Sequence, residues 1–195
     1  MASVVDVCNV SLSNIGHGAG VVSIDPPDGS AYSAHCARFY PIARDEVLET
    51  HPWRFALKRA QLALSGTAPD SWSYQYAMPS DCIRVLSVLP DGYSDDMTQT
   101  GDYVLEGDYL LTNTQLATLH YISRVTDTSK WSPSFASAVS WKLSQYLSGA
   151  IVKGDALMRG YCAKQYQESL MIAMGFNAQA SKTRPAHVPV WMQDR

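Results

Sequence analysis

Ser132–Ile151, SPSFASAVSWKLSQYLSGAI, is the stretch that decides the fold. Serine followed by proline is typical of a helix start, because serine caps free amides and proline suits the first turn. Apolar residues then recur three or four positions apart and predict one buried face, made of Phe135, Val139, Leu143, Tyr146/Leu147 and Ala150/Ile151. After Gly154-Asp155 a second series predicts another long helix that ends near Gly175, with Met158, Cys162, Tyr166, Leu170 and Ala173. Two helices joined this closely should form an antiparallel hairpin over residues 131–176.

The first 52 residues are also predicted to be helical. Val5, Cys8, Leu12 and Ile15 follow helical spacing, and the glycines at 16, 18 and 20 should end this helix. Ser30 is the expected N-cap of a second helix, whose apolar face is Cys36, Phe39/Tyr40, Ala43 and Val47. Pro41 within it predicts a kink or a restart, and His51-Pro52 should close it.

Residues 53–125 are predicted to be β-rich. Residues 53–64 fit either a helix or a strand, whereas Cys82 to Leu89 is rich in β-branched residues. Tyr103–Leu105 and Tyr109–Leu111 flank Glu106-Gly107-Asp108 as in a tight hairpin, and Leu116 to Ile122 adds a strand. We therefore expect an α+β fold: N-terminal helices, a small antiparallel β-meander and a C-terminal helical hairpin in one domain, 1–176. An extended arm should follow over 177–195, where Pro185 and Pro189 interrupt any periodicity.

The composition favours covered surfaces over chemistry. Charged residues make up only 17% of the chain, which contains 11 Tyr and 5 Trp, and aromatic residues are favoured at protein interfaces. Trp53 and Trp72 are expected in the core, and Trp191 in a partner's pocket. Residues 65–129 contain nine acidic and two basic residues, which argues against tight DNA binding. The start of the chain lacks the basic residues of a signal peptide, and no stretch reaches the about 20 apolar residues of a membrane span, so we expect synthesis and assembly in a reducing cytoplasm.

The chemical motifs are weak, and the sequence predicts no enzyme, cofactor or metal site. Gly16-His17-Gly18-Ala19-Gly20 lacks the preceding strand of a phosphate loop and is interpreted as a linker. His35 and Cys36 are adjacent, so on a helix they point in different directions. The cysteines at 8, 36, 82 and 162 lack metal-ligand spacing and are interpreted as small buried residues. The carboxylates between Asp91 and Asp108 lack the register of a calcium loop and are expected in solvated hairpin loops.

Five segments together resemble the tail tubular protein A and head–tail adaptor family of short-tailed bacteriophages. They are spread over about residues 3–176: Cys8-Asn9-Val10 through Ile24-Asp25, Ala43–Leu48, His51–Ala56, Tyr76–Val85 and Trp131–Phe135. The resemblance favours a strand over residues 53–64. It implies a structural protein of the virion, located at the head–tail junction and without enzymatic activity. Copies of it would form a ring, usually of twelve, between the portal protein and the tail nozzle, and genomic DNA would pass through the lumen.

Two sets of contact residues follow from this resemblance. The subunit-packing residues are expected on the helical hairpin: Phe135, Val139, Leu143, Tyr146 and Tyr166. The portal-binding residues are expected on the basic arm: Lys182, Arg184, Pro185, Pro189, Trp191, Met192 and Arg195. Two alternatives to the adaptor remain: a tail-completion or tail-terminator protein, and a small-ligand-binding or enzyme domain whose site forms only in the fold.

Overall fold

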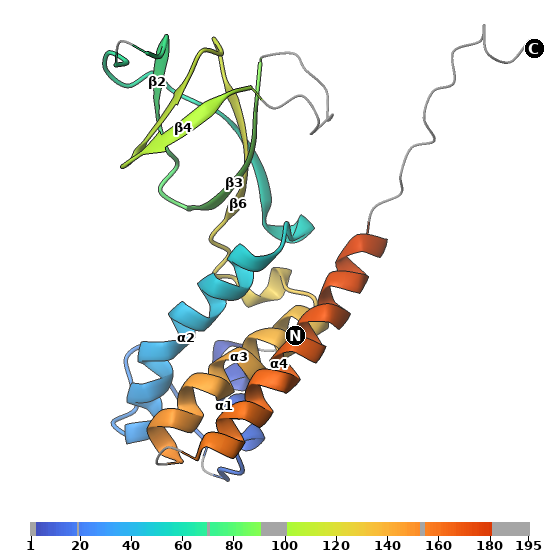
Figure 1. Ribbon diagram of the computed structural model, residues 1–195. Coiled ribbons are helices and arrows are strands. Elements are labelled where there is room, and N and C mark those ends of the chain that lie inside the picture. Colours follow the sequence, from blue (N-terminus) through green and yellow to red (C-terminus); the bar gives the residue numbers. More distant parts are fainter. Residues whose placement is uncertain (1–2, 19, 70, 91–100, 153–154, 181–195) are drawn as a thin grey trace, which may run out of the picture.

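The computed structural model of the chain has an α+β fold, as predicted, with four long helices at one end and the strands at the other (Figure 1). It describes residues 3–18, 20–69, 71–90, 101–152 and 155–180. The helices are α1 (Val4–Asn14), α2 (Ala31–Thr50), α3 (Pro133–Ile151) and α4 (Ala156–Gln179). Two short 3-10 helices, η1 (Arg54–Ala56) and η2 (Thr128–Lys130), lie where the chain passes between the helices and the strands.

Each long helix begins at a residue whose side chain caps its free amides. Ser3 and Asp6 form a reciprocal capping box on α1. Ser30 accepts from Ser33 N at the start of α2, and Ser132 from Phe135 N at the start of α3, which confirms both predicted caps. Asp155 accepts from two amides of α4. These local signals are the reason why the helix starts could be predicted from the sequence.

Helix α2 runs without interruption through Pro41 and ends before His51, so the chain does not restart at the proline. Pro41 is exposed, and its ring therefore meets solvent instead of the packed core. The predicted apolar face of α2 is confirmed, because Cys36, Tyr40, Ala43 and Val47 are all buried.

The strands form two antiparallel three-stranded sheets, not the predicted meander. One sheet has the order β1 (Leu57–Gln61), β6 (Thr118–Ser123), β3 (Cys82–Leu89), and the other has the order β2 (Tyr74–Ala77), β5 (Tyr109–Thr112), β4 (Tyr103–Glu106). Only β4 and β5 are neighbours along the chain as well as in a sheet, and they form the predicted hairpin with Gly107 at φ 59°. The physical reason is burial: residues of both sheets share one apolar cluster, which a single open meander would leave exposed on one face.

The ambiguous segment 53–64 forms a strand after a short 3-10 turn, and the helix alternative is wrong. Residues 54–56 form η1, and the chain then enters β1, whose Leu57 pairs with Ile122 of β6. Trp53 is buried, as expected, whereas Trp72 is only half-buried and belongs to neither of the two core clusters, so the expectation of a core Trp72 is wrong.

Helices α3 and α4 form the predicted hairpin, but α4 continues beyond Gly175 to Gln179. Asn177, which the sequence placed in the arm, lies on this last helical turn. Its side-chain oxygen accepts from Arg54 N at 2.9 Å, and its amide nitrogen lies 2.9 Å from His51 Nε2. These tertiary contacts stabilise a turn that local sequence does not specify. The rest of the predicted arm, from residue 181, lies outside the described residues.

The buried face of α3 gives the first prediction. Leu143→Asp places an uncompensated carboxylate where the leucine is fully buried, and it should lower the free energy of unfolding by about 3–5 kcal/mol. Leu157→Asp, in the first turn of α4, is the control, because Leu157 is 85% exposed and should change stability little. Chemical denaturation of both variants measures the difference. Equal stability of the two would contradict this buried face.

Candidate assembly surfaces and the helix–strand junction

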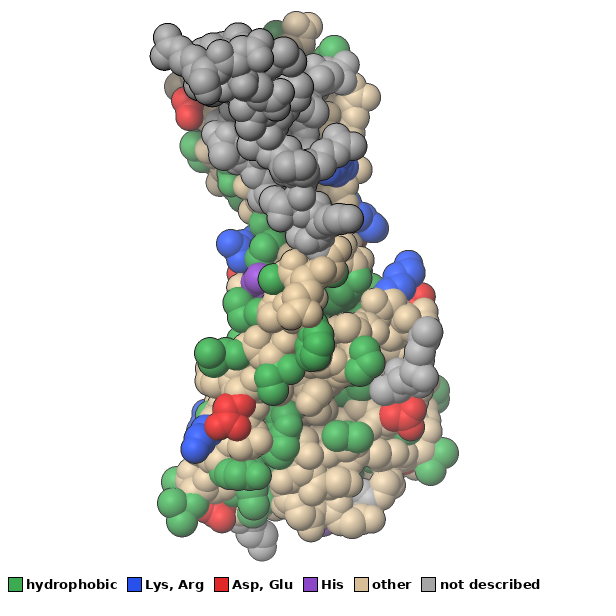
Figure 2. All heavy atoms as spheres, turned by 90° about the vertical axis from the view of Figure 1, so that its right-hand side faces the viewer, with side chains coloured by type: hydrophobic (Ala, Val, Ile, Leu, Met, Phe, Trp, Pro, Cys, Tyr) green, Lys and Arg blue, Asp and Glu red, His purple; other side chains and the backbone are tan. Residues whose placement is uncertain are grey.

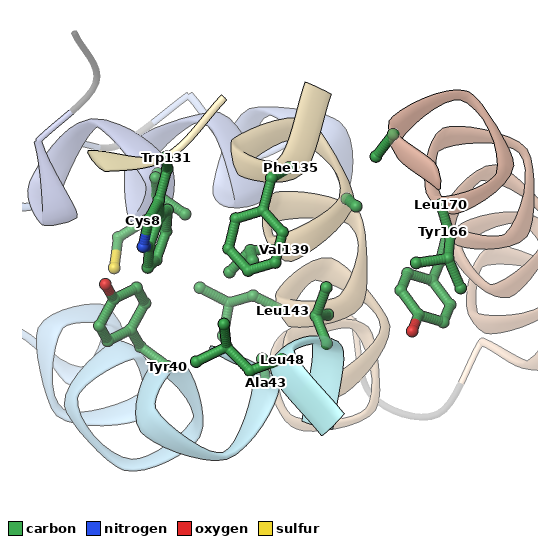
Figure 3. Close-up of a cluster of buried hydrophobic side chains, with 14 of the residues drawn as sticks. Cys8, Tyr40, Ala43, Leu48, Trp131, Phe135, Val139, Leu143, Tyr166 and Leu170 are labelled. Atoms are coloured by element: carbon green, nitrogen blue, oxygen red, sulfur yellow. The ribbon is translucent and has the colours of Figure 1, made fainter. Parts of the chain in front are cut away.

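An aromatic cluster forms the junction between the helices and the strands. The ring of Phe135 meets those of Trp53, Phe55 and Trp131 edge-on, with centroid distances of 4.9, 4.8 and 5.0 Å. Figure 3 shows Trp131 and Phe135 side by side above Val139 and Leu143 of α3. The indole of Trp53 also donates to Val47 O at 2.7 Å, so burial leaves its polar group satisfied.

Two adjacent acids of α2 connect that helix to different parts of the molecule. Asp45 lies 2.7 Å from Arg44 and 2.9 Å from Arg124, which follows β6. Glu46 accepts from Tyr146 and lies 2.9 Å from Lys142, both on α3. The Lys142 ammonium is also 5.1 Å from the ring centroid of Tyr166 on α4. Glu46 and Lys142 therefore join three helices.

A third acid, Asp81, connects strands of one sheet. Its carboxylate lies 2.6 Å from Lys58 Nζ of β1 and accepts from Tyr121 Oη of β6 at 3.0 Å. Its carbonyl accepts from Arg124 N at 2.7 Å. Asp81 thus stands just before β3 and contacts the other two strands of that sheet.

The N-terminal loop is held by one side chain. Asn9 accepts from Val21 N at 2.7 Å and donates to Val21 O at 3.1 Å, which ties the chain after α1 back onto the helix.

Ser11 donates to Ser140 O, and Ser144 donates to Ser11 O, so two small side chains let α1 and α3 pack closely. The Gly16–Gly20 stretch follows the end of α1, and Gly16 has a φ of 77°. Of its described residues, none follows a strand as a phosphate loop requires.

These contacts assign a structural position to every segment that carries the resemblance. Asn9, Asp45, Glu46, Trp53, Asp81, Trp131 and Phe135 each connect two or more elements or hold a loop. The segments therefore encode how the parts of the chain join.

The predicted subunit-packing residues are mostly interior, which corrects that expectation. Phe135, Val139 and Leu143 are completely buried within the chain, and Tyr166 is 5% exposed. Tyr146 is half-buried and contacts Glu46. Side chains already covered by α1, α2 and α4 have no surface left for another subunit (Figure 3).

The other face of α4 carries several exposed apolar residues. The apolar surface of this helix comprises Leu157, Tyr161, Met171, Ile172 and Phe176, each more than half exposed. Figure 2 shows apolar side chains spread over this side of the helical part, with few charges between them. Exposed apolar groups grouped in this way are typical of protein interfaces. The sequence analysis did not identify this surface, because it used the apolar periodicity of the helix only to predict the buried face.

A groove between α1 and α3 extends this surface. It has a volume of about 550 Å³ and no charged residue lines it. Its lining residues are Val7, Val10, Asn14, Thr128, Trp131, Ser132, Pro133, Ala136, Ser137, Ser140 and Trp141. Trp141 also meets the ring of Tyr161 edge-on at 5.9 Å, so the groove and the α4 surface share a border. We call the groove and the exposed α4 residues together the apolar side.

The adjacent His35 and Cys36, which the sequence analysis considered as a catalytic pair, do not face each other. Cys36 is fully buried and its thiol faces Cys8, whereas His35 stacks on Phe39. The hydrogen bond to Cys36 and burial raise the pKa of the Cys8 thiol, which keeps it protonated and unreactive. Cys8, Cys36 and Cys162 are buried as predicted, but Cys82 is half-buried.

Within the described ranges, no three His, Cys, Asp or Glu side chains are close enough together to hold a metal ion. Glu106 and Asp108 lie exposed at the β4–β5 hairpin as expected, whereas Asp91, Asp95 and Asp96 lie outside the described residues. The arm residues predicted to bind the portal, Lys182 through Arg195, also lie outside them.

Comparison with protein-family models finds no match to this chain, and comparison with curated proteins finds none either. Among the described helices, none is long and apolar enough to cross a membrane.

The Glu46 contacts predict a pH-dependent contribution to stability. Burial acts to raise the pKa of Glu46, but hydrogen bonds from Lys142 and Tyr146 and the charge of Lys142 outweigh it and lower the pKa. A lowered pKa in the folded state stabilises the fold above the unfolded-state pKa of about 4.3, and this contribution is lost as the pH falls through the folded-state value.

Glu46→Gln should therefore be less stable than the parent at pH 7, and the difference should shrink as the pH is lowered below about 4. Urea unfolding midpoints of both proteins between pH 3 and 7 measure this. Glu168→Gln is the control, because it removes an exposed carboxylate that lies 3.9 Å from Lys164. It should change the urea unfolding midpoint little at any pH between 3 and 7. A Glu46→Gln effect that stays constant with pH would contradict the ion-pair explanation.

Proposed function

We propose that this chain is a structural head-to-tail adaptor of a bacteriophage virion. In this proposal, copies of the chain form a ring between the portal protein and the tail nozzle, and genomic DNA passes through the lumen. The observation that carries the proposal is the ordered series of segments that resemble the adaptor family, each of which lies at a joint of the fold. A resemblance at the joints bears on the architecture of the whole chain, whereas a resemblance in one loop would not.

The apolar side supports the assembly part of the proposal. A ring subunit must present two different surfaces to its two neighbours, because a head-to-tail contact is heterologous. The exposed face of α4 carries apolar residues around the Lys164–Glu168 ion pair, and the α1–α3 groove is lined by no charged residue. We infer that these two surfaces contribute to the contacts between adjacent subunits, in place of the interior residues predicted from sequence.

The charge distribution supports a lumen that does not hold DNA. Nine acidic and two basic residues lie in residues 65–129, which include most of the strands. Acidic groups repel a phosphate backbone, so such a surface would let DNA slide past. A tail-completion protein would use the same apolar contacts and differ only in its neighbour, so binding to purified portal distinguishes the two functions.

Particle size tests this proposal. Purified protein, alone or mixed with its portal, should form rings in negative-stain images and sediment as a species many times heavier than its 21.4 kDa chain. Met171→Asp, at a residue that is 71% exposed on α4, should reduce ring formation at least about tenfold, because an interface must then desolvate a carboxylate.

Val22→Asp is the matched control. Val22 is 83% exposed but lies on the loop between α1 and α2 and is not one of the residues of the apolar side, so its substitution should leave ring formation unchanged. A parent protein that remains monomeric with and without portal would contradict the adaptor function. Rings that form equally well from Met171→Asp would retain that function but exclude the α4 surface as the contact.

A further inference from the structure

The last turn of α4 is held by a side-chain amide whose orientation its partners determine. Asn177 Oδ1 accepts from Arg54 N at 2.9 Å, and Asn177 Nδ2 donates to Pro52 O at 3.3 Å. The same Nδ2 lies 2.9 Å from His51 Nε2. A backbone N–H can only donate and a backbone carbonyl can only accept. Arg54 and Pro52 therefore fix which end of the amide is the oxygen and which is the nitrogen.

This orientation determines the protonation state of His51. The Nδ2 group of Asn177 is a donor only, so His51 Nε2 must be the acceptor. The imidazole is then neutral, with its proton on Nδ1. If the amide rotated by half a turn, its oxygen could accept from a protonated Nε2. That rotation would place the amide nitrogen against Arg54 N–H and the oxygen against the Pro52 carbonyl, so two hydrogen bonds would be lost for the one gained.

The charges around His51 also favour the neutral ring. Burial, and after it the positive charge of Arg84 on β3, lowers the pKa of His51. His51 caps the end of α2, where the carbonyl groups attract a cation, but Arg84 already donates to Glu49 O at 3.0 Å and supplies that charge. The side chains of Glu49 and Arg54 are exposed, and residues 169–180 of α4 include no titratable side chain.

We propose that His51 is a pH-dependent anchor for the end of α4, and that protonation of its Nε2 releases the last helical turn from the segment between α2 and β1. A protonated Nε2 and the Nδ2 group of Asn177 are both donors, so they repel each other at this distance. The His51 ring is held in place by its edge-on contact with the buried Trp53, at a centroid distance of 5.0 Å. Phe176 directly precedes Asn177, so the end of the apolar side is released together with the anchor. This inference concerns the single chain and does not depend on the adaptor function.

The sign of the pH dependence follows from the direction of the pKa shift. A histidine whose pKa is lowered in the folded state stabilises that state fully above its unfolded-state pKa of about 6.5. The contribution is lost as the pH falls through the folded-state value. The anchor should therefore be closed at pH 8 and should open on mild acidification.

Histidine side-chain NMR of the full-length protein tests the assignment without any substitution. At pH 8 the His51 ring should carry its proton on Nδ1, and its titration midpoint should lie below about 6.5. The amide of Arg54 reports the bond to Asn177 directly. Its hydrogen-exchange protection, corrected for the intrinsic pH dependence of exchange, should fall at least about fivefold through the same midpoint, which is the effect of about one hydrogen bond.

Three full-length variants separate His51 from other titrating groups. His51→Gln keeps an uncharged acceptor near the position of Nε2, so the Arg54 amide should stay protected over the whole pH range. Asn177→Asp replaces the donor by a carboxylate oxygen and should raise the His51 midpoint above about 6.5. His35→Gln is the matched control, because it removes a histidine of α2 that stacks on Phe39, and it should leave the pH dependence unchanged.

Three outcomes would overturn the proposal. A proton on Nε2 at pH 8 would contradict the orientation of the amide. Arg54 protection that does not change while His51 titrates would mean that the end of α4 does not depend on this ring. A pH-dependent loss of protection that persists in His51→Gln would assign the effect to another group. None of these outcomes bears on ring formation with the portal, so this proposal and the proposed function can fail separately.

Discussion

The packing of three aromatic rings on Phe135 is the interaction on which the arrangement of this protein depends. The chain passes between helices and strands twice, at residues 51–57 and 123–133, and both crossings supply rings to this cluster. Each edge-on pair contributes about 0.5–1.5 kcal/mol beyond the apolar area that it buries. The indole groups of Trp53 and Trp131 donate to Val47 O and Val125 O, which fixes the backbone on both sides of the cluster. The position of the strands relative to the helices follows from this joint.

The parts of the fold that could be predicted are those with local signals. Ser30, Ser132 and His51-Pro52 mark helix ends through contacts within a few residues, and Gly107 marks a hairpin turn by its backbone freedom. The sheet order could not be predicted, because β1 pairs with β6 across about sixty residues and only the shared apolar cluster between the sheets selects that pairing. The true end of α4 depends in the same way on the contact of Asn177 with Arg54, which no local pattern reveals.

For the candidate surfaces, the sequence does not show which apolar residues are covered within the chain and which stay exposed. Apolar periodicity identified Tyr166 and Leu170 as a helix face but did not reveal whether another helix or another subunit covers it. Helix α4 is apolar on both sides, with Cys162 and Ala173 buried and Met171 and Ile172 exposed. The low charge of the chain agrees with the apolar residues that α4 exposes, but composition does not say where on the molecule such residues lie. Only the packed structure shows which face of α4 contacts α3 and which face stays exposed.

The apolar side and a second hollow lie on different parts of the molecule. The apolar side belongs to the helices and suits contact with a broad complementary surface, whereas a slot of about 730 Å³ is lined by residues of β3, β4 and the loops beside them. No residue lines both the groove and the slot. The helices and the strands contact each other through the Phe135 cluster, the Asp45–Arg124 ion pair and the hydrogen bond from Arg84 to Glu49 O, so coupling between the two parts would use contacts of this kind.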